Sequence, residues 1–176
     1  IESNLMYNEK EPVLLQPESF LSKAELLKYN KVTLPHDWMI SNTNALYRNS
    51  VGFYKKQFEL SEEQIQNKHN AIRFEGVYMN SAVWINGNLA GTWKYGYATF
   101  EFDISDLVKA GTNEILVIAV YQDCNTRWYS GAGIFRDVNL IQTQKTFLTT
   151  DGVYIRPRKI DENKWKSYID SNPKEK

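Results

Sequence analysis

The densest group of chemically useful side chains in this sequence occupies one short segment between two apolar runs. It combines aromatic, cationic and amide side chains with paired glycines, in the order Asn125-Thr126-Arg127-Trp128-Tyr129-Ser130-Gly131-Ala132-Gly133-Ile134-Phe135-Arg136-Asp137-Val138. Loops carried on a rigid scaffold often hold binding residues. Aromatic faces beside arginine and asparagine donors suit a sugar, whose ring stacks on the aromatic face while its hydroxyls form hydrogen bonds. The segment is therefore a candidate sugar contact.

A structural explanation fits the same residues. Trp128, Tyr129 and Phe135 would bury the corner of a β-sandwich, because aromatic side chains dominate the energetics of protein cores. Residue spacing alone slightly favours this buried corner over a binding loop, and both hypotheses stay open at this point.

Other chemistries find little support. His36 and Asp37 are adjacent, and Ser130 is a possible nucleophile. However, neighbours in an extended chain face opposite ways, and Ser130 lacks the upstream glycine that a nucleophile elbow needs. A structural corner made by Pro35, His36 and Trp38 is the better interpretation. Two histidines and one cysteine make no zinc site, and no glycine-rich loop precedes a helix, so no cofactor is expected.

The composition is that of a single β-rich domain. The chain has 176 residues, and its 21 Lys and Arg balance its 21 Asp and Glu. A nucleic-acid-binding protein shows a basic footprint, so neither nucleic acid nor a membrane is an expected partner. The longest apolar run, Ile115 to Tyr121, is far shorter than the ~20 residues that span a bilayer.

The single cysteine and the start of the chain bear on its compartment. Cys124 has no second cysteine to pair with. It is expected to be a small, partly buried side chain without a chemical role. The chain starts at Ile1 with no signal peptide pattern. Because the initiator Met is missing, processing is expected, and a periplasmic or secreted location is slightly favoured over the cytoplasm.

Alternating apolar and polar residues predict strands over much of the chain. The alternation runs through 54–60, where Lys56 interrupts the apolar face, and through 72–75 and 100–104. It is typical of half-buried strands. Ile115 to Tyr121 is apolar on both faces, which predicts a central strand covered on both sides. Asn86-Gly87 supplies two residues that tolerate positive φ and predicts a tight hairpin. Short strands separated by turn residues predict an antiparallel sandwich or barrel.

Helical structure is expected only in short pieces. A weak helical pattern runs from Pro17 to Leu27, long enough for one or two turns. Single helical turns are predicted at 61–64 and 105–108, each capped by the serine at its start.

Seven further motifs precede the 125–138 segment, and together they resemble one protein family. In chain order they are Leu34-Pro35-His36-Asp37-Trp38, Gly52-Phe53-Tyr54-Lys55-Lys56-Gln57-Phe58, Phe74-Glu75-Gly76-Val77, Ser81-Ala82-Val83-Trp84-Ile85-Asn86-Gly87, Gly96-Tyr97, Phe100-Glu101-Phe102-Asp103-Ile104 and Gly111-Thr112-Asn113. The set resembles the N-terminal domain of family 2 glycoside hydrolases, the β-galactosidase family. The resemblance extends from about Val32 to Ile141, and Arg127-Trp128-Tyr129 is closer to the β-galactosidase branch than to the β-glucuronidase branch.

The resemblance implies an all-β fold, an antiparallel β-sandwich of the jelly-roll, galactose-binding-like type. It also implies a non-catalytic domain that buttresses the catalytic barrel of a retaining glycoside hydrolase and contributes a loop to the sugar pocket. Carried over by position, Arg127 and Trp128 are sugar-binding residues, and Asp123 and Asn125, just upstream, are candidate partners for sugar hydroxyls. The implied partners are a carbohydrate, a β-galactoside or a related sugar, and the downstream domains of the same polypeptide. The chain departs from a glycine-rich family stretch at Asn44 to Val51.

Catalysis is not expected from this chain alone. Retaining glycosidases place two carboxyl groups about 5 Å apart, and in the resembled family both lie on a later barrel of about 250 residues. Glu101 and Asp103 share a strand face, with Cα atoms roughly 6–7 Å apart. The solvated side of an amphipathic strand explains this pair better, so no catalytic residue is assigned.

The predicted organisation has three parts. Residues 1–31 form an N-terminal extension that packs on the sandwich, 32–145 form the β-sandwich sugar-binding domain, and 146–176 form a linker or the start of a truncated following domain. The family would begin an immunoglobulin-like domain in this last part, with 147–150 as its first strand. Two rival functions remain open: an autonomous carbohydrate-binding module or lectin, and a purely architectural domain that does not touch substrate.

Overall fold

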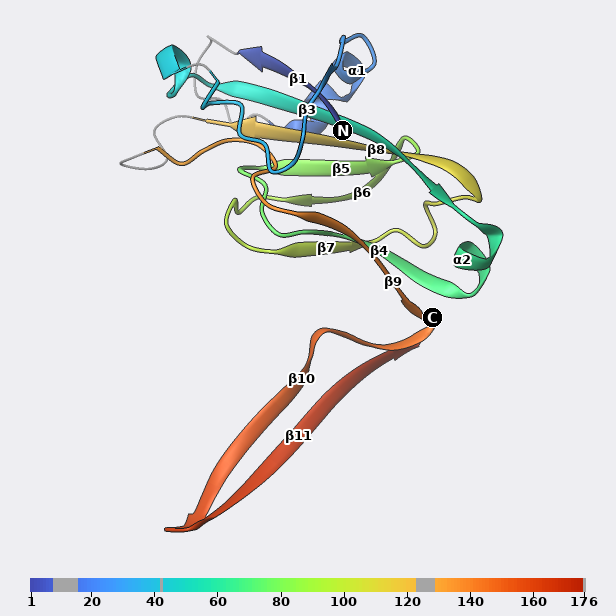
Figure 1. The fold of residues 1–176 in the computed structure, drawn as a ribbon, viewed down its shortest axis with the longest axis vertical. Coiled ribbons are helices and arrows are strands. Elements are labelled where there is room, and N and C mark those ends of the chain that lie inside the picture. The colour runs from blue at the N-terminus through green and yellow to red at the C-terminus, as the bar shows by residue number, and fades with distance from the viewer. Residues whose placement is uncertain (8–15, 42, 123–128, 176) are drawn as a thin grey trace.

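The computed structural model describes residues 1–7, 16–41, 43–122 and 129–175. Two antiparallel sheets face each other across an apolar core, and a long two-stranded hairpin extends away from them (Figure 1). The predicted all-β fold, an antiparallel β-sandwich, is confirmed. Within the described residues, no helix is long and apolar enough to cross a membrane.

The two sheets differ in width. The larger sheet has the strand order β2-β1-β3-β8-β5-β6, formed by β1 (Glu2–Tyr7), β2 (Asn30–Lys31), β3 (Ser50–Leu60), β5 (Ser81–Ile85), β6 (Asn88–Trp93) and β8 (Gly111–Tyr121). The smaller sheet has the order β7-β4-β9, formed by β4 (Lys68–Phe74), β7 (Phe100–Asp103) and β9 (Val138–Gln144). A short 3-10 helix, η2 (Thr43–Ala45), precedes β3.

Strand β8 lies inside the larger sheet, between β3 and β5, and is covered on both faces. Because successive strand residues point to opposite faces, Val117 enters the core between the sheets while Ile118 points the other way. The outer face is covered by η1 (Pro17–Phe20) and α1 (Leu21–Ala24). This arrangement confirms both the central strand and the short helical piece predicted near the N-terminus.

Two predicted turns form as expected. Asn86 and Gly87 have φ angles of 51° and 82°, and they close the tight hairpin between β5 and β6. Helix α2 (Glu62–Gln66) starts with a capping box, in which Ser61 Oγ accepts from the Gln64 N–H and Gln64 Oε1 accepts from the Ser61 N–H. The reciprocal bonds satisfy two backbone donors that the helix itself leaves free.

The turn at 105–108 forms, but the predicted serine cap is wrong. The Ile104 carbonyl accepts the N–H groups of two residues in this turn. Ser105 Oγ instead accepts from the Asn70 N–H of β4 at 3.0 Å, and Asp103 Oδ1 accepts from the Ser105 N–H at 3.0 Å. The neighbouring strand therefore uses the hydroxyl that would otherwise cap the turn.

The hairpin leaves the sandwich directly after β9. It consists of β10 (Thr146–Asp161) and β11 (Lys164–Glu175). Two contacts join its base to the smaller sheet: the Phe147 ring stacks on His69 with centroids 4.3 Å apart, and Thr150 Oγ1 donates to Glu101 Oε2 at 3.1 Å. Beyond this base the hairpin stands clear of the sandwich (Figure 1).

Candidate functional site

Two motifs that are far apart in sequence lie against each other and form the candidate site. The main-chain N–H of His36 donates to the Ile134 carbonyl at 2.7 Å, and that of Trp38 donates to the Ala132 carbonyl at 3.1 Å. These bonds join the 34–38 corner to the segment that starts at Tyr129. The side chains of the corner then determine how this segment is held.

The carboxylate of Asp37 makes the central contacts between the two motifs. Its Oδ1 accepts from the Met39 N–H at 2.9 Å and from the Ala132 N–H at 3.1 Å, and its Oδ2 accepts from the Tyr129 hydroxyl, 92 residues away in sequence. Burial, together with the hydrogen bond to Asp37, raises the pKa of Tyr129 above its usual value. Tyr129 therefore stays protonated at neutral pH and keeps donating to Asp37.

His36 and Asp37 serve different partners and do not form a catalytic dyad. The Nδ1 atom of His36 lies 2.9 Å from the Tyr54 hydroxyl, and burial lowers the pKa of His36 although Asp37 opposes the shift. The buried indole of Trp38 donates to Ser50 Oγ at 3.0 Å. The side chains of His36, Asp37 and Trp38 are each held by hydrogen bonds, which agrees with the structural corner expected from the sequence.

Gly133 is required by the backbone at this junction. Its φ of +117° lies in the region that favours glycine, and a Cβ would lie 2.6 Å from the main-chain oxygen of His36. The Gly133 main chain also exchanges two hydrogen bonds with Tyr78, at 2.7 and 2.9 Å. The glycine thus lets the corner and the segment after the loop approach closely.

A group of aromatic side chains lies beside this junction. Tyr97, on the connection between β6 and β7, packs against Tyr78 and Phe135, with ring centroids 5.1 and 5.9 Å apart. Its hydroxyl donates to the Ser130 carbonyl at 3.1 Å. Tyr95 lies at right angles to it and is 63% exposed. In the sequence, Gly96-Tyr97 is recognisable only as a family motif. Tyr95 gives no sequence signal, because a tyrosine in a turn does not by itself indicate a binding site.

Comparison with known proteins decides the family. A family model described as glycosyl hydrolases family 2, sugar binding domain, matches residues 7–144. The chain belongs to this family.

The relatives of this family 2 domain are much longer proteins. The β-galactosidase BoGH2A of Bacteroides ovatus is 36% identical over 141 residues, covering 73% of this chain and 16% of the relative. A β-glucuronidase of Bacteroides fragilis is 33% identical over 144 residues, covering 71% of this chain and 20% of the relative. The chain therefore spans a fifth or less of the length of these curated relatives.

Solved structures agree on the fold. A family 2 glycosyl hydrolase from Bacteroides cellulosilyticus matches with a TM-score of 0.68 and 28% identity, covering 87% of this chain and 22% of that one. The FMN-binding β-glucuronidase from Facaelibacterium prausnitzii matches with a TM-score of 0.75 and 20% identity, over 97% of this chain and 26% of that one. The β-sandwich described above is the N-terminal domain architecture of family 2 enzymes.

The sugar-binding residues predicted from the sequence lie outside the described residues of the family 2 domain. They are Asp123, Asn125, Arg127 and Trp128, and Cys124 lies there as well. The described residues on either side are anchored: Tyr121 is buried in the core at the end of β8, and Tyr129 donates to Asp37.

The carboxylates of β7 have structural partners. Glu101 accepts from Thr150, and Asp103 Oδ2 lies 3.3 Å from Nε2 of the buried His69. These contacts agree with the amphipathic strand that the sequence predicts. Among the described residues, no group of three or more His, Cys, Asp or Glu side chains could hold a metal ion.

A groove of the family 2 domain that borders the junction at Leu34, Tyr54 and Ile134 is less suited to a sugar. It has a volume of about 640 Å³ and opens between β9 and the part of the larger sheet near β2 and β3. Core side chains such as Ile72, Phe74 and Val117 line it, with a few polar groups that include Lys56 and Asp137. A mainly apolar lining offers few partners for sugar hydroxyls, so the junction around Asp37 remains the better candidate.

Proposed function

We propose that this family 2 domain serves a longer retaining glycoside hydrolase, in which it buttresses the catalytic barrel and contributes the loop after β8 to the sugar pocket. The observation that carries the proposal is the Asp37 junction. Asp37 holds Tyr129 and Ala132, so the segment that follows the loop is mounted on the sandwich. Binding side chains need such a support, because productive geometry must be kept to about 0.5 Å.

The proposed sugar contacts are Asp123, Asn125, Arg127 and Trp128. Trp128 would supply a ring face, and Arg127 would supply charged donors to hydroxyls, for which the planar guanidinium is well suited. Relatives of this domain are named as β-galactosidases and as β-glucuronidases. The Arg127-Trp128-Tyr129 sequence favours a β-galactoside or a related sugar as the substrate of the whole enzyme.

The exposed apolar face of the hairpin supports the presence of a following domain. Val153, Ile155, Trp165 and Ile169 share one face of the ribbon, where each is between 45% and 66% exposed. An isolated two-stranded hairpin is at best marginally stable, and an apolar sheet face normally packs on another layer. This face requires a second layer of polypeptide.

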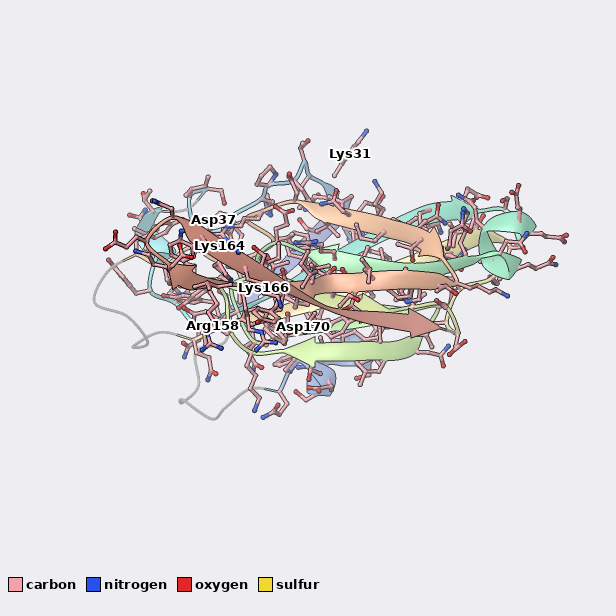
Figure 2. All side chains as sticks on the ribbon, turned by 90° about the horizontal axis from the view of Figure 1, so that it is seen from below. Lys31, Asp37, Arg158, Lys164, Lys166 and Asp170 are labelled. Atoms are coloured by element: carbon pink, nitrogen blue, oxygen red, sulfur yellow. The ribbon has the colours of Figure 1, made fainter. Side chains whose placement is uncertain are left out.

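The opposite face of the hairpin suits solvent. Arg156 forms an ion pair with Asp170 at 2.7 Å and lies over the Tyr168 ring. Figure 2 labels Arg158, Lys166 and Asp170, which share this charged face of the hairpin. We therefore assign residues 146–176 to the first strands of a following domain.

The same proposal divides the rest of the chain. Residues 32–145 form the sugar-binding sandwich, and residues 1–31 form an extension that packs on it. The buried Phe20 and Ala24 of this extension cover the outer face of the larger sheet, and Glu2–Tyr7 pairs with β3 along its edge.

Replacing Arg127 by alanine in the complete enzyme tests the shared pocket. Hydrogen bonds to charged groups contribute about 1.5–3 kcal/mol, so kcat/KM should fall roughly ten- to hundredfold with little change in Tm. Arg158→Ala, on the charged face of the hairpin, is the matched control and should leave kcat/KM unchanged.

The alternative, an architectural domain that does not touch substrate, predicts the opposite result for Arg127→Ala. If Arg127 pairs only with a local carboxylate such as Asp137, Arg127→Ala lowers Tm and leaves kcat/KM intact. That outcome would remove the loop from the sugar pocket and leave the domain as a buttress.

A further inference from the structure

Two tyrosines expose their rings beside the Asp37 junction. Tyr95 is 63% exposed and Tyr97 is 41% exposed, and both belong to the connection between β6 and β7 (Figure 1). Their ring centroids are 6.0 Å apart with an angle of 70° between the planes. The two rings therefore meet in an edge-to-face arrangement.

Tyr97 is held in place by the segment that starts at Tyr129. The Tyr97 hydroxyl donates to the Ser130 carbonyl at 3.1 Å, and the Tyr97 carbonyl accepts from Arg136 Nη1 at 3.3 Å. The ring also packs against Tyr78 and Phe135. A ligand that stacks here would meet an aromatic surface that is already ordered, which lowers the entropy cost of binding.

A cationic hydrogen-bond donor lies beside Tyr97. Arg136 is exposed, and its Nη1 donates to the carbonyls of Glu75 and Tyr97, each at 3.3 Å. A guanidinium carries five N–H donors, so donors remain for a ligand. The exposed Lys94 precedes Tyr95 in the chain. Exposed aromatic rings with a guanidinium bound beside Tyr97 match the face and the hydroxyls of a sugar ring, because the ring stacks and the remaining donors bind hydroxyls.

We infer that Tyr95 and Tyr97 form a platform for a pyranose ring, a second sugar contact in addition to the one proposed for residues 123–128. The inference rests on the sugar-binding role proposed above and adds a contact to it. It concerns the ring face that galactosides and glucuronides share, so both should bind the platform.

Saturation-transfer NMR on the 176-residue chain tests the platform, using methyl β-galactopyranoside and methyl β-glucopyranosiduronate as probes at millimolar concentration. Tyr95→Ala should raise Kd about three- to tenfold, the range expected for one aromatic contact. Tyr95→Phe keeps the ring and should retain binding. Tyr154→Ala is the matched control, because Tyr154 is also 63% exposed but lies on the hairpin. It should leave Kd unchanged.

Two results would overturn the platform. One is the absence of saturation transfer from the wild-type chain to either probe, and the other is an unchanged Kd in both Tyr95→Ala and Tyr97→Ala.

The same substitution in the complete enzyme separates the platform from a contact with a neighbouring domain. A higher KM with unchanged Tm supports the platform, whereas a lower Tm with unchanged KM assigns the tyrosines to a domain interface and overturns it. Arg127→Ala reports independently on the loop. If Arg127→Ala lowers kcat/KM and Tyr95→Ala does nothing, the platform fails and the proposed function stands.

Discussion

Two tryptophans on β-strands show how differently the sandwich and the hairpin are built. Trp84 on β5 is 3% exposed, under the helical piece that covers the outer face of the larger sheet. Trp165 on β11 is 62% exposed, on the apolar face of the hairpin. Both residues lie on β-strands, so strand propensity does not explain the difference. The sandwich supplies its own second layers, whereas the apolar face of the hairpin is uncovered among the described residues.

The largest expected effect comes from removing each indole in turn. Trp84→Ala deletes a buried aromatic side chain and should cost about 3–5 kcal/mol, enough to prevent soluble expression of this chain. Trp165→Ala, the matched control, should change the free energy of unfolding by about 0.5 kcal/mol or less. Thermal melts of both variants check the comparison, and a soluble Trp84→Ala with an unchanged Tm would mean that the covering layer contributes nothing.

High pH should weaken the covering layer through Tyr29, whose hydroxyl donates to the Ala24 carbonyl at 2.8 Å. Burial, followed by the carboxylates of Glu114 and Glu2, raises the pKa of Tyr29 to about 12. A raised pKa means that the folded state holds the proton more tightly. The resulting stability is present in full below pH 10, the usual tyrosine pKa, and is lost as the pH rises through 12.

Wild type should therefore be more stable than Tyr29→Phe by about 1 kcal/mol at pH 8, and the advantage should shrink between pH 10 and 12. Tm measured against pH for both proteins tests this. Tyr154→Phe, an exposed hairpin tyrosine, serves as the control. An advantage that stays constant up to pH 12 would contradict the assignment of Tyr29 to a buried, protonated contact.

Removing the hairpin should have the smallest effect on the sandwich. A chain that ends at Lys145 loses the stack of Phe147 on His69 and the exposed bond from Thr150 to Glu101. The stack contributes about 1 kcal/mol, so Tm should fall by about 2–4 °C. Phe147→Ala in the complete chain should reproduce most of this loss. A shortened chain that does not fold would show that the sandwich depends on the hairpin far more than these contacts suggest.

The sequence was a good guide wherever local pattern sets the structure. The unbroken apolar run at Ile115 to Tyr121 requires cover on both faces, and β8 has it. Asn86-Gly87 closes a hairpin because both residues tolerate positive φ. Ser61 caps α2 because Gln64 follows it by three residues and completes the capping box. Each of these depends on residues within a few positions of one another.

The hairpin was harder to predict from the sequence. Only residues 147–150 were expected to form a strand, whereas β10 and β11 extend from Thr146 to Glu175. The charged face of the hairpin carries arginine and lysine, such as Arg158 opposite Lys166. In the linear sequence, a stretch with so many charged residues resembles a linker. The cross-strand pairing that separates an apolar face from a charged one exists only once the two strands are aligned.

The sequence by itself determined the fold class, the family and the motifs, because strand periodicity, turn residues and motif order are local properties. Only the tertiary structure decided which motifs meet. Asp37 reaches Tyr129 across 92 residues, Tyr97 reaches Ser130 across 33, and Ser105 bonds to Asn70 instead of capping its own turn. Such contacts depend on which strands become neighbours in the two sheets, and burial then selects one partner for each polar group from several that the sequence allows.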